Sequence, residues 1–317
     1  MATPIKLGFI GLGAMGFPMA SNLIRNSAKG SQLFIYDVSE ASLKRFSEKH
    51  PGSTVICKSP AEVSKSTHIL FTMLPEGSHV KSVYLDPVTG VLHDGMTAKI
   101  LIDCSTIDVD TPPLVLDELR SRHPSVSFFD APVSGGTLGA EAASITIMLG
   151  ASEQDPLYPM LLAQLSLMGK NIVACGGPGM GLTAKMCNNY CSGLIALATA
   201  EAMNIGIRSG MDPRLLGRVF SSSTAQSTIC DKWNPVPGVV PAAPSSHGYQ
   251  GGFKVQLMAK DFGLAMQAAE KVEATTLLGP AGLETYRKAA QDPNCRDLDS
   301  RVVFRYIGGD EKWQDKL

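Results

Sequence analysis

A lysine and two asparagines stand close together in a segment that otherwise carries little charge. They are Lys185, Asn188 and Asn189, and the residues that follow them through position 209 are mostly small and apolar and carry little charge. A charged side chain on an apolar helix is rarely placed without a partner or a role. A lysine whose pKa is lowered towards neutrality can act as a general acid and base. The segment therefore predicts acid–base chemistry at Lys185.

Spacing joins one of the asparagines to the lysine. Asn189 follows Lys185 by four residues, so the two side chains share one face of a helix. Asn189 can therefore point its amide at the same small molecule as Lys185, and Asn188 is a further candidate for binding it. The alternatives are a solvated surface lysine and asparagines that only hydrogen-bond nearby backbone.

A glycine-rich turn near the start of the chain predicts a dinucleotide site. The pattern GxGxxG follows the apolar run Leu7–Ile10 directly and opens a helical segment. Its first glycine permits a tight turn, its second lets the backbone approach a pyrophosphate, and its third lets helix and strand pack closely. The candidate cofactor contacts in this turn are Gly11, Leu12, Gly13, Ala14, Met15 and Gly16. An ordinary glycine-rich turn is the alternative.

An acidic residue favours one form of that cofactor. Asp37 ends the second apolar run, Leu33–Tyr36, where a carboxylate can accept hydrogen bonds from the adenosine ribose. A carboxylate there repels the 2′-phosphate of NADP, and no Lys or Arg follows before Lys44. NAD is therefore favoured over NADP. The alternative is that Asp37 only begins the turn into the next helix.

Two kinds of structure must position these residues. Up to about residue 173, β-type runs alternate with helical segments, which predicts a doubly wound, largely parallel sheet of the Rossmann type. The runs are Leu7–Ile10, Leu33–Tyr36, Val55–Cys57, Ile69–Met73, Ile100–Asp103, Val126–Phe129, Ile145–Leu149 and Ile172–Ala174. The later helices are Met180–Ser209, Pro213–Ser221, Val255–Val272, Leu277–Ala290 and a short piece near Leu298–Tyr306. We expect a cofactor domain at 1–174 and an all-α domain for substrate and subunit contacts at 175–317.

A proline- and glycine-rich segment interrupts the helices between Trp233 and Gly252. It predicts neither regular helix nor strand. Because Trp233, Tyr249 and Phe253 stand at its ends, an ordered loop near the site is favoured over a flexible linker.

Length and charge limit the classes of partner. A chain of 317 residues favours two domains, and a net charge of −1 offers no field to gather nucleic acid or an anionic membrane. The longest apolar stretch, Cys191–Ile207, contains Glu201 and Asn204, which favours a buried helix over a membrane span. A small-molecule partner is expected.

The cysteines and histidines predict no metal site. Seven scattered cysteines are typical of reduced thiols, and Cys187 with Cys191 is interpreted as core packing rather than half of a zinc site. The start of the sequence runs directly into an apolar strand, so a cytoplasmic location is expected for the chain as written. A mature protein of the mitochondrial matrix would look the same.

Four motifs in order carry a resemblance to a known family. They are GFIGLGAMGFPMASNL at 8–23, DAPVSGG at 130–136, GPGMG at 177–181 with KMCNN at 185–189, and LMAKD at 257–261. Together they closely resemble the β-hydroxyacid dehydrogenase family over nearly the whole chain. The segments at 190–206 and 232–253 look most like members that act in valine breakdown.

The resemblance implies reversible, NAD-dependent oxidation of a 3-hydroxy acid, with Lys185 taking the hydroxyl proton. It implies that Asn189 binds the substrate hydroxyl or carboxylate and that Asn188 lies further from the substrate, although the sequence alone could exchange these two roles. Ser134, Gly135 and Gly136 would cradle the carboxylate, for which a glycine-rich turn is the alternative. Further implied cofactor contacts are Leu74, Pro75, Thr106, Phe253 and Lys260. His79 departs from an asparagine found in some relatives, and we expect it at the surface.

Other activities share parts of this pattern. Reductases of tartronate semialdehyde, glyoxylate or succinic semialdehyde would share the glycines, Ser134 and Lys185, but Asp37 argues against the members that prefer NADPH. A non-catalytic dinucleotide-binding scaffold needs neither Lys185 nor Asn189. Imine reductases have a similar architecture but generally lack the lysine. The long apolar helix beginning at Met180 predicts a homodimer or homotetramer.

Overall fold

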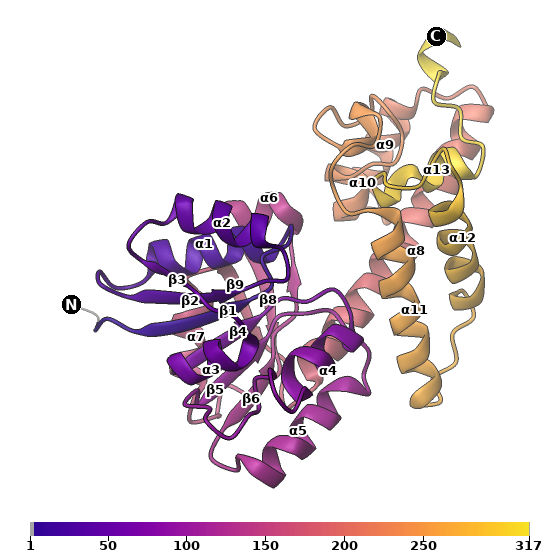
Figure 1. Ribbon diagram of the computed structural model, residues 1–317. Helices are drawn as coiled ribbons and strands as arrows, with labels where there is room; N and C mark the ends of the chain where they lie inside the picture. The colour runs from indigo at the N-terminus through magenta and orange to yellow at the C-terminus, as the bar shows by residue number, and fades with distance from the viewer. Residues whose placement is uncertain (1–2, 317) are drawn as a thin grey trace. The chain divides into compact units, whose positions relative to one another are not determined.

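The computed structural model describes residues 3–316 of the chain. Two compact units form, with their boundary between Lys185 and Met186. The first unit contains the β-strands and the second is helical (Figure 1). The predicted fold class, a Rossmann-type sheet followed by an all-α part, is confirmed. The predicted domain limits, 1–174 and 175–317, stay a prediction.

Six parallel strands make the main sheet of the first unit, in the order β3-β2-β1-β4-β5-β6. They are β1 (Lys6–Ile10), β2 (Gln32–Tyr36), β3 (Thr54–Ile56), β4 (Ile69–Thr72), β5 (Ile100–Asp103) and β6 (Ser127–Asp130). Parallel strands covered on both faces are nearly continuous apolar runs, which is why they were predictable. The strand order reverses between β1 and β4. Sheets of this kind bind ligands at that point, beyond the carboxyl ends of the strands.

A helix follows each of the first five strands. They are α1 (Gly16–Asn26), α2 (Glu40–Lys49), α3 (Pro60–Ser66), α4 (Gly77–Leu85) and α5 (Thr111–Arg122). α1 and α2 cover one face of the sheet, and α3, α4 and α5 cover the other (Figure 1). Between the layers lies an apolar core in which the fully buried Phe9 and Phe71 stack with ring centroids 6.2 Å apart.

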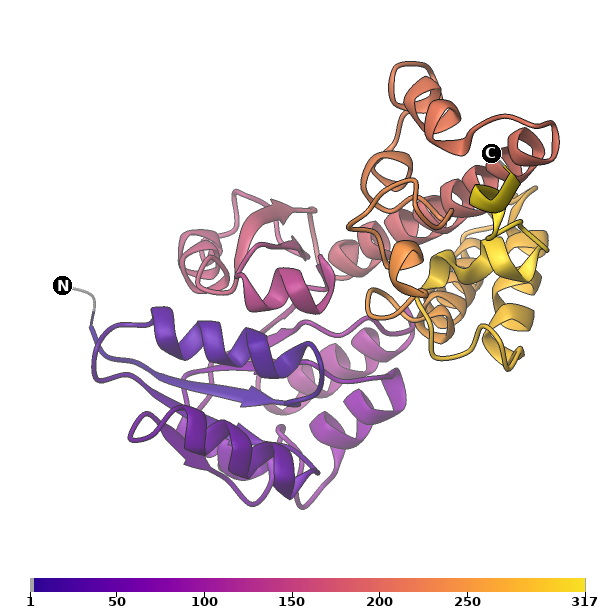
Figure 2. The same ribbon diagram turned by 90° about the horizontal axis from the view of Figure 1, so that it is seen from above.

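A second sheet of three strands completes this unit, in the order β7-β8-β9. Its elements are β7 (Val133–Ser134), α6 (Gly136–Glu141), β8 (Ile145–Leu149), α7 (Tyr158–Leu165) and β9 (Gly169–Ala174). α6 packs beside α1, where the Asn22 side chain donates to the carbonyl of Ala140 at 2.6 Å (Figure 2). The last two predicted strands therefore form, but outside the doubly wound sheet. Only two residues separate β6 from β7, too few for the crossover that a parallel neighbour needs.

The second unit is built from helices. They are the remainder of α8 (Met180–Arg208), α9 (Pro213–Ser221), α10 (Thr228–Lys232), α11 (Val255–Lys271), α12 (Gly279–Gln291) and α13 (Val303–Tyr306), with 3₁₀ turns η1 (Pro244–His247), η2 (Ser300–Val302) and η3 (Trp313–Lys316). The four long helices agree with the prediction to within two residues, whereas α10 was not predicted. Fully buried Phe262, Tyr286 and Phe304 lie in the core of this unit.

The segment between Trp233 and Gly252 is an ordered loop, as predicted. Val236 and Tyr249 are fully buried, and the Tyr249 hydroxyl donates to the carbonyl of Pro235 at 2.9 Å. The expectation of no regular structure is wrong for η1. Pro244 opens that turn, a position where proline costs nothing because its N–H would be unpaired anyway.

α8 contributes to both units, because it begins six residues before the boundary at Met186. Among residues 3–316 it is the one helix long and apolar enough, by length and composition, to cross a membrane, and 33% of its most apolar window is buried. Ala196, Ala200 and Met203 are buried, whereas Ile205 is 67% exposed. The prediction of a buried helix is therefore correct for one side only.

Candidate functional site

The glycine-rich turn has the geometry that a dinucleotide requires. Gly11 has φ +96°, and a Cβ there would overlap the carbonyl oxygen of Met73. A Cβ at Gly16 would overlap the carbonyl oxygen of Gly11. At Gly13 nothing in the described chain lies within 4 Å of the Cβ position, so the backbone there is open to a ligand. The three glycines thus have the turn, approach and packing roles of the fingerprint.

The start of α1 suits an anion. Leu12 is buried, Ala14 and Gly13 are exposed, and Met15 precedes the first helical residue. Within the described residues, α1 has no side-chain cap and no acidic residue in its first turn. Its N–H groups and positive dipole end therefore fit a pyrophosphate. NAD(P) would be held here by the turn backbone.

The Asp37 carboxylate lies against this turn. Its Oδ2 accepts the backbone N–H of Leu12 at 2.5 Å, and its Oδ1 accepts the N–H of Ser39 at 2.7 Å. Ser39 in turn caps α2 by accepting the N–H of Ser42. Asp37 therefore does begin the turn into the next helix, as the alternative reading held. Its contact with a ribose stays a prediction.

A buried carboxylate anchors the loops after β4 and β5. Oδ1 of Asp103 accepts the hydroxyls of Thr72 at 2.7 Å and Ser105 at 2.6 Å. The Ser105 hydroxyl oxygen accepts the N–H of Leu74 at 2.8 Å. Leu74 is thereby fixed at the carboxyl edge of the sheet, and the exposed Pro75 follows it. Thr106, half-buried, follows Ser105 on the neighbouring strand end.

We expect this carboxylate to give stability a pH dependence. Burial raises the pKa of Asp103 to about 6, although hydrogen bonds from Ser105 and Thr72 oppose the rise. Between about pH 4 and 6 the folded chain holds a proton that the unfolded chain has lost, so the contribution of Asp103 to stability falls as pH rises. The loss is about 3 kcal/mol, fully felt above pH 6. Asp103→Asn keeps an acceptor for Thr72 and Ser105 and does not titrate.

Urea unfolding at pH 4.5, 5.5 and 7 measures this effect. The unchanged chain should lose stability relative to Asp103→Asn as pH rises through that range. Asp117→Asn serves as the control, because that carboxylate is 71% exposed on α5. If the free energies of unfolding of the unchanged chain and of Asp103→Asn changed equally with pH, the raised pKa of Asp103 would be contradicted.

Ser134 lies elsewhere than expected. It belongs to β7, the edge strand of the second sheet, where it pairs with Thr146, and not to a loop directly after the doubly wound sheet. Gly135 and Gly136 follow with φ +135° and +64°, which only glycine adopts readily. At Gly136 nothing in residues 3–316 lies within 4 Å of the Cβ position. The backbone of this turn is therefore accessible, as a carboxylate cradle requires.

Lys185 is buried. It lies in the second turn of α8 with 6% of its surface exposed. A solvated surface lysine is therefore excluded. Buried ammonium groups are rare unless they are paired or functional.

A hydrogen-bonded cluster in the second unit holds the asparagines. Asn189 is buried, and its Nδ2 donates to Oδ2 of Asp261 at 2.7 Å. Its Oδ1 accepts the Nδ2 of the exposed Asn188 at 3.1 Å. The Lys260 ammonium lies 3.2 Å from Oδ1 of Asp261. One carboxylate thus joins an expected substrate residue, Asn189, to an expected cofactor residue, Lys260.

Asn189 and Asp261 should act as one unit in kinetics. Asn189→Ala and Asp261→Ala are each expected to lower kcat/KM about 10- to 100-fold, because each leaves a buried polar partner unsatisfied. The double variant should be little worse than either single one, with a coupling energy of about 1 to 2 kcal/mol. Steady-state kinetics of the three variants measure it. Strictly additive losses would show that the 2.7 Å hydrogen bond does not matter for turnover.

The two other expected positions are Phe253, just before α11, and His79, on α4. The Phe253 N–H donates to Oδ2 of the buried Asp299 at 2.8 Å, just before α11 begins. His79 is exposed, as predicted.

Two of the cysteine interpretations are wrong. Cys187 and Cys191 are exposed rather than part of the core. Which side of α8 is exposed is not revealed by the residue types alone. All seven cysteines are free. No group of three or more His, Cys, Asp or Glu that could hold a metal occurs in residues 3–316.

Sequence reasoning missed several buried carboxylates, among them Asp103, Asp130 and Asp261. Of these three, two end apolar strand runs and the third follows Lys260. An acidic residue directly after an apolar run, or within one of the ordered motifs, is the signal that could have found them.

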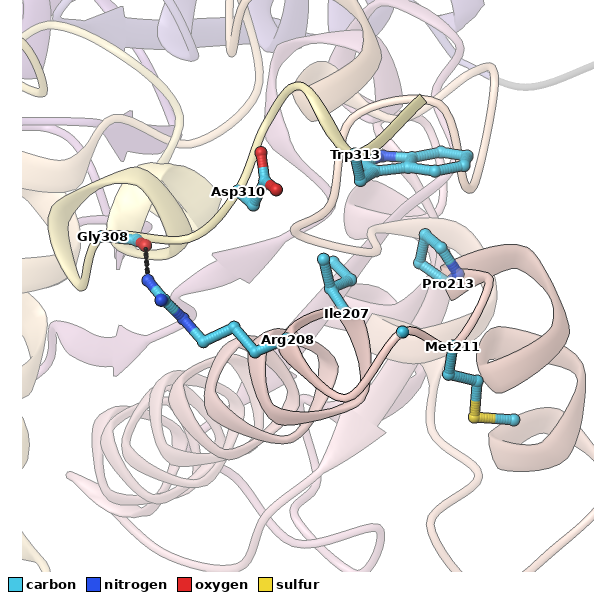
Figure 3. A pocket seen from close by; sticks show the side chains of 8 residues that line it. Ile207, Arg208, Met211, Pro213, Gly308, Asp310 and Trp313 are labelled. Carbon is cyan, nitrogen blue, oxygen red and sulfur yellow. Dashed lines mark hydrogen bonds between the residues drawn. The ribbon is translucent and has the colours of Figure 1, made fainter. Parts of the chain in front are cut away.

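A cavity of about 650 Å³ lies beside the carboxyl end of α8 (Figure 3). Its lining residues are Ile207, Arg208, Gly210, Met211, Pro213, Gly308, Asp310 and Trp313. Arg208 donates across one side to the carbonyl of Gly308 at 2.8 Å. Ile207 stands 18 residues beyond Asn189 on α8, about 27 Å along the axis. This cavity is therefore not the candidate site.

Two family descriptions, both of NAD-binding regions of dehydrogenases, match consecutive parts of the chain. Residues 6–177 match the family described as the NAD binding domain of 6-phosphogluconate dehydrogenase. Residues 179–307 match the family described as NAD-binding of NADP-dependent 3-hydroxyisobutyrate dehydrogenase.

Named relatives span nearly the whole chain. A probable mitochondrial 3-hydroxyisobutyrate dehydrogenase of Dictyostelium discoideum is 43% identical, over 88% of this chain and 84% of that protein. The mitochondrial enzyme of that name from Mus musculus is 40% identical, over 98% and 89%. The solved Mycobacterium tuberculosis 3-hydroxyisobutyrate dehydrogenase with L-serine is 30% identical, with TM-score 0.84 over 96% and 99%. The ordered motifs, the fold and these relatives agree: the chain belongs to the 3-hydroxyisobutyrate dehydrogenase family.

Proposed function

We propose that this chain is an NAD-dependent dehydrogenase that oxidises 3-hydroxyisobutyrate to methylmalonate semialdehyde, a step of valine breakdown. The observation that carries the proposal is identity of about 40% over 98% of the chain to enzymes of that name. The solved relative described with L-serine supports the substrate class. L-serine has the carboxylate and the 3-hydroxyl group that 3-hydroxyisobutyrate also has.

We assign the chemical roles within this proposal to residues of both units. Bound NAD would supply the acceptor for the hydride that leaves the alcohol carbon. Lys185 takes the hydroxyl proton as that hydride leaves, and returns a proton in the reverse direction. Ser134 and the backbone of Gly135 and Gly136 hold the substrate carboxylate. Asn189, whose Nδ2 already donates one hydrogen bond to Asp261, offers its second N–H to the substrate.

The remaining assignments concern the cofactor and the domains. The turn from Gly11 to Gly16 binds the pyrophosphate and Asp37 the ribose, while Leu74, Pro75, Thr106, Phe253 and Lys260 complete the cofactor contacts. Residues 1–174 form the cofactor domain and 175–317 the substrate and oligomerisation domain.

A substrate panel with both cofactors tests the proposal. Purified protein should reduce NAD far faster than NADP with (S)-3-hydroxyisobutyrate. Tartronate semialdehyde, glyoxylate and succinic semialdehyde, each offered with NADH and NADPH, complete the panel. No rate with 3-hydroxyisobutyrate together with strong NADPH-dependent glyoxylate reduction would overturn the assignment.

We further propose a homodimer or a dimer of dimers formed through α8. Cys187, Cys191, Ala198 and Ile205 recur on one side of that helix and are exposed. Exposed apolar helix faces of this length usually meet a partner. Light scattering should give two or four times the 33.6 kDa of one chain. Ile205→Glu should lower that mass, and a monomeric unchanged chain would remove the proposal.

The names of the relatives bear on the cellular compartment of this chain. Several curated relatives are named as mitochondrial. We propose the mitochondrial matrix for this chain, and fractionation of the source cells would distinguish it from the cytoplasm.

A further inference from the structure

The side chain of Asp130 forms the start of the helix that carries Lys185. Asp130 is the last residue of β6 and is 2% exposed. Its Oδ1 accepts the N–H of Gly179 at 2.7 Å and its Oδ2 accepts the N–H of Leu182 at 2.8 Å. Gly179 directly precedes α8 and Leu182 lies in its first turn, the region where helices leave N–H groups unpaired. A residue about 50 positions earlier in the chain thus caps this helix.

Two glycines make room for this carboxylate. A Cβ at Gly150 would overlap Oδ1 of Asp130. A Cβ at Gly181 would overlap the Met148 carbonyl oxygen and lie 2.8 Å from Oδ2 of Asp130. The Asp130 carbonyl also accepts the N–H of Gly150 at 2.7 Å. The carboxylate therefore occupies space that a side chain at Gly150 or Gly181 would need.

Burying a charged carboxylate at this position costs folding free energy. Burial raises the pKa of Asp130, and the N–H groups of Leu182, Gly179 and Gly181 oppose that rise. Asp103 stands opposite Asp130 in the strand register, and the charge of Asp130 raises its pKa further. Two carboxylates side by side cost folding free energy that an amide or apolar pair would avoid. The N–H groups at the start of α8 therefore offset part of the cost of burying this carboxylate.

We propose that Asp130 is a positioning residue that fixes where α8 begins and thereby where Lys185 stands. This inference rests on the proposed role of Lys185. Lys185 is three residues beyond Leu182, about 4.5 Å further along the helix axis. Ser134 follows Asp130 by four residues. One rigid segment thus sets both the lysine and the turn expected to hold the substrate carboxylate.

Asp130→Asn tests the inference. The amide keeps one acceptor but turns an N–H₂ group towards a backbone N–H, so the first turn of α8 must shift. We expect kcat to fall about 100-fold, since displacement of a reacting group by about 1 Å has that effect. The dissociation constant for NAD should stay within about twofold, because the glycine turn is untouched. A deuterated substrate should give a larger isotope effect on kcat, because the chemical step becomes slower.

Hydrogen exchange supplies a readout that does not depend on activity. Amides at 179–182 should exchange faster in Asp130→Asn, while those of β1 and α1 should not change. Gly150→Ala is the second variant, because its methyl group displaces the same carboxylate while the charge remains. The controls are Asp117→Asn and Gly263→Ala, since a Cβ at Gly263 would lie 3.8 Å from Cδ1 of Leu283, an ordinary van der Waals contact.

The outcomes separate this inference from the proposed function. Faster exchange at 179–182 with unchanged kcat would overturn the positioning role and leave the dehydrogenase assignment intact. Unchanged exchange in both variants would overturn the cap itself. An unchanged chain that is inactive in the substrate panel would refute the proposed function and with it the role assigned to Asp130. If Asp130→Asn does not fold, Gly150→Ala carries the test.

Discussion

Lys185→Ala is expected to lower kcat for 3-hydroxyisobutyrate oxidation about 1,000-fold while NAD binding stays within about twofold. The alcohol proton then has no buried amine to accept it, whereas the glycine turn and Asp37 are unchanged. Lys185→Arg should be nearly as inactive, because a guanidinium keeps its protons at every usable pH. Steady-state rates and a fluorescence titration with NADH measure the two effects.

Lys288→Ala is the matched control for this experiment. Its side chain is 59% exposed on α12, where it pairs with Glu284, and its removal should leave the rate unchanged. A rate for Lys185→Ala within tenfold of the unchanged chain would exclude Lys185 as the acid–base group. An equal loss in NAD affinity would instead indicate that the lysine shapes the cofactor site.

Asp37→Ser is expected to change the ratio of kcat/KM for NAD to that for NADP about 100-fold in favour of NADP. Near a protein surface, the carboxylate of Asp37 and a 2′-phosphate 4 Å away would repel each other by about 4 kcal/mol. A 100-fold change in the ratio corresponds to about 3 kcal/mol, so loss of this repulsion is large enough to cause it. Part of the loss with NAD arises because Oδ2 of Asp37 also holds the N–H of Leu12. Kinetics with both cofactors measure the ratio.

Asp37→Asn separates charge from hydrogen bonding. The amide oxygen can still accept the N–H of Leu12, but no negative charge faces a 2′-phosphate. It should recover NADP use with a smaller loss towards NAD than the serine variant. If neither variant changes the ratio, Asp37 serves only the turn into α2, which its hydrogen bond to Ser39 already supports.

Most of the secondary structure could be predicted because its signals are local. The strand near Ile69 is a run of buried apolar residues, and Pro213 marks the first residue of α9. The separate second sheet could not be predicted, since strand partners are set by crossover length and not by the strand itself. β7, with only Val133 and Ser134, is too short to leave a periodic signal.

The sequence indicates candidate site residues, but it does not indicate the buried carboxylates that hold the surrounding backbone. Lys185 and Asn189 are conspicuous because their surroundings are apolar. Asp130 and Asp103 are not, because an aspartate after a strand looks the same whether it begins a turn or caps a helix 50 residues away. The exposed Cys187 illustrates the same limit, since the side of a helix that is covered depends on tertiary packing.

The unbroken course of α8 has a mechanical consequence. Lys185 is the last residue of one unit and Asn189 lies one turn later in the other. A helical turn keeps such neighbours about 6 Å apart. The backbone hydrogen bonds of this turn therefore hold the amine proposed to take the proton and the amide proposed to bind the substrate at a constant spacing along α8.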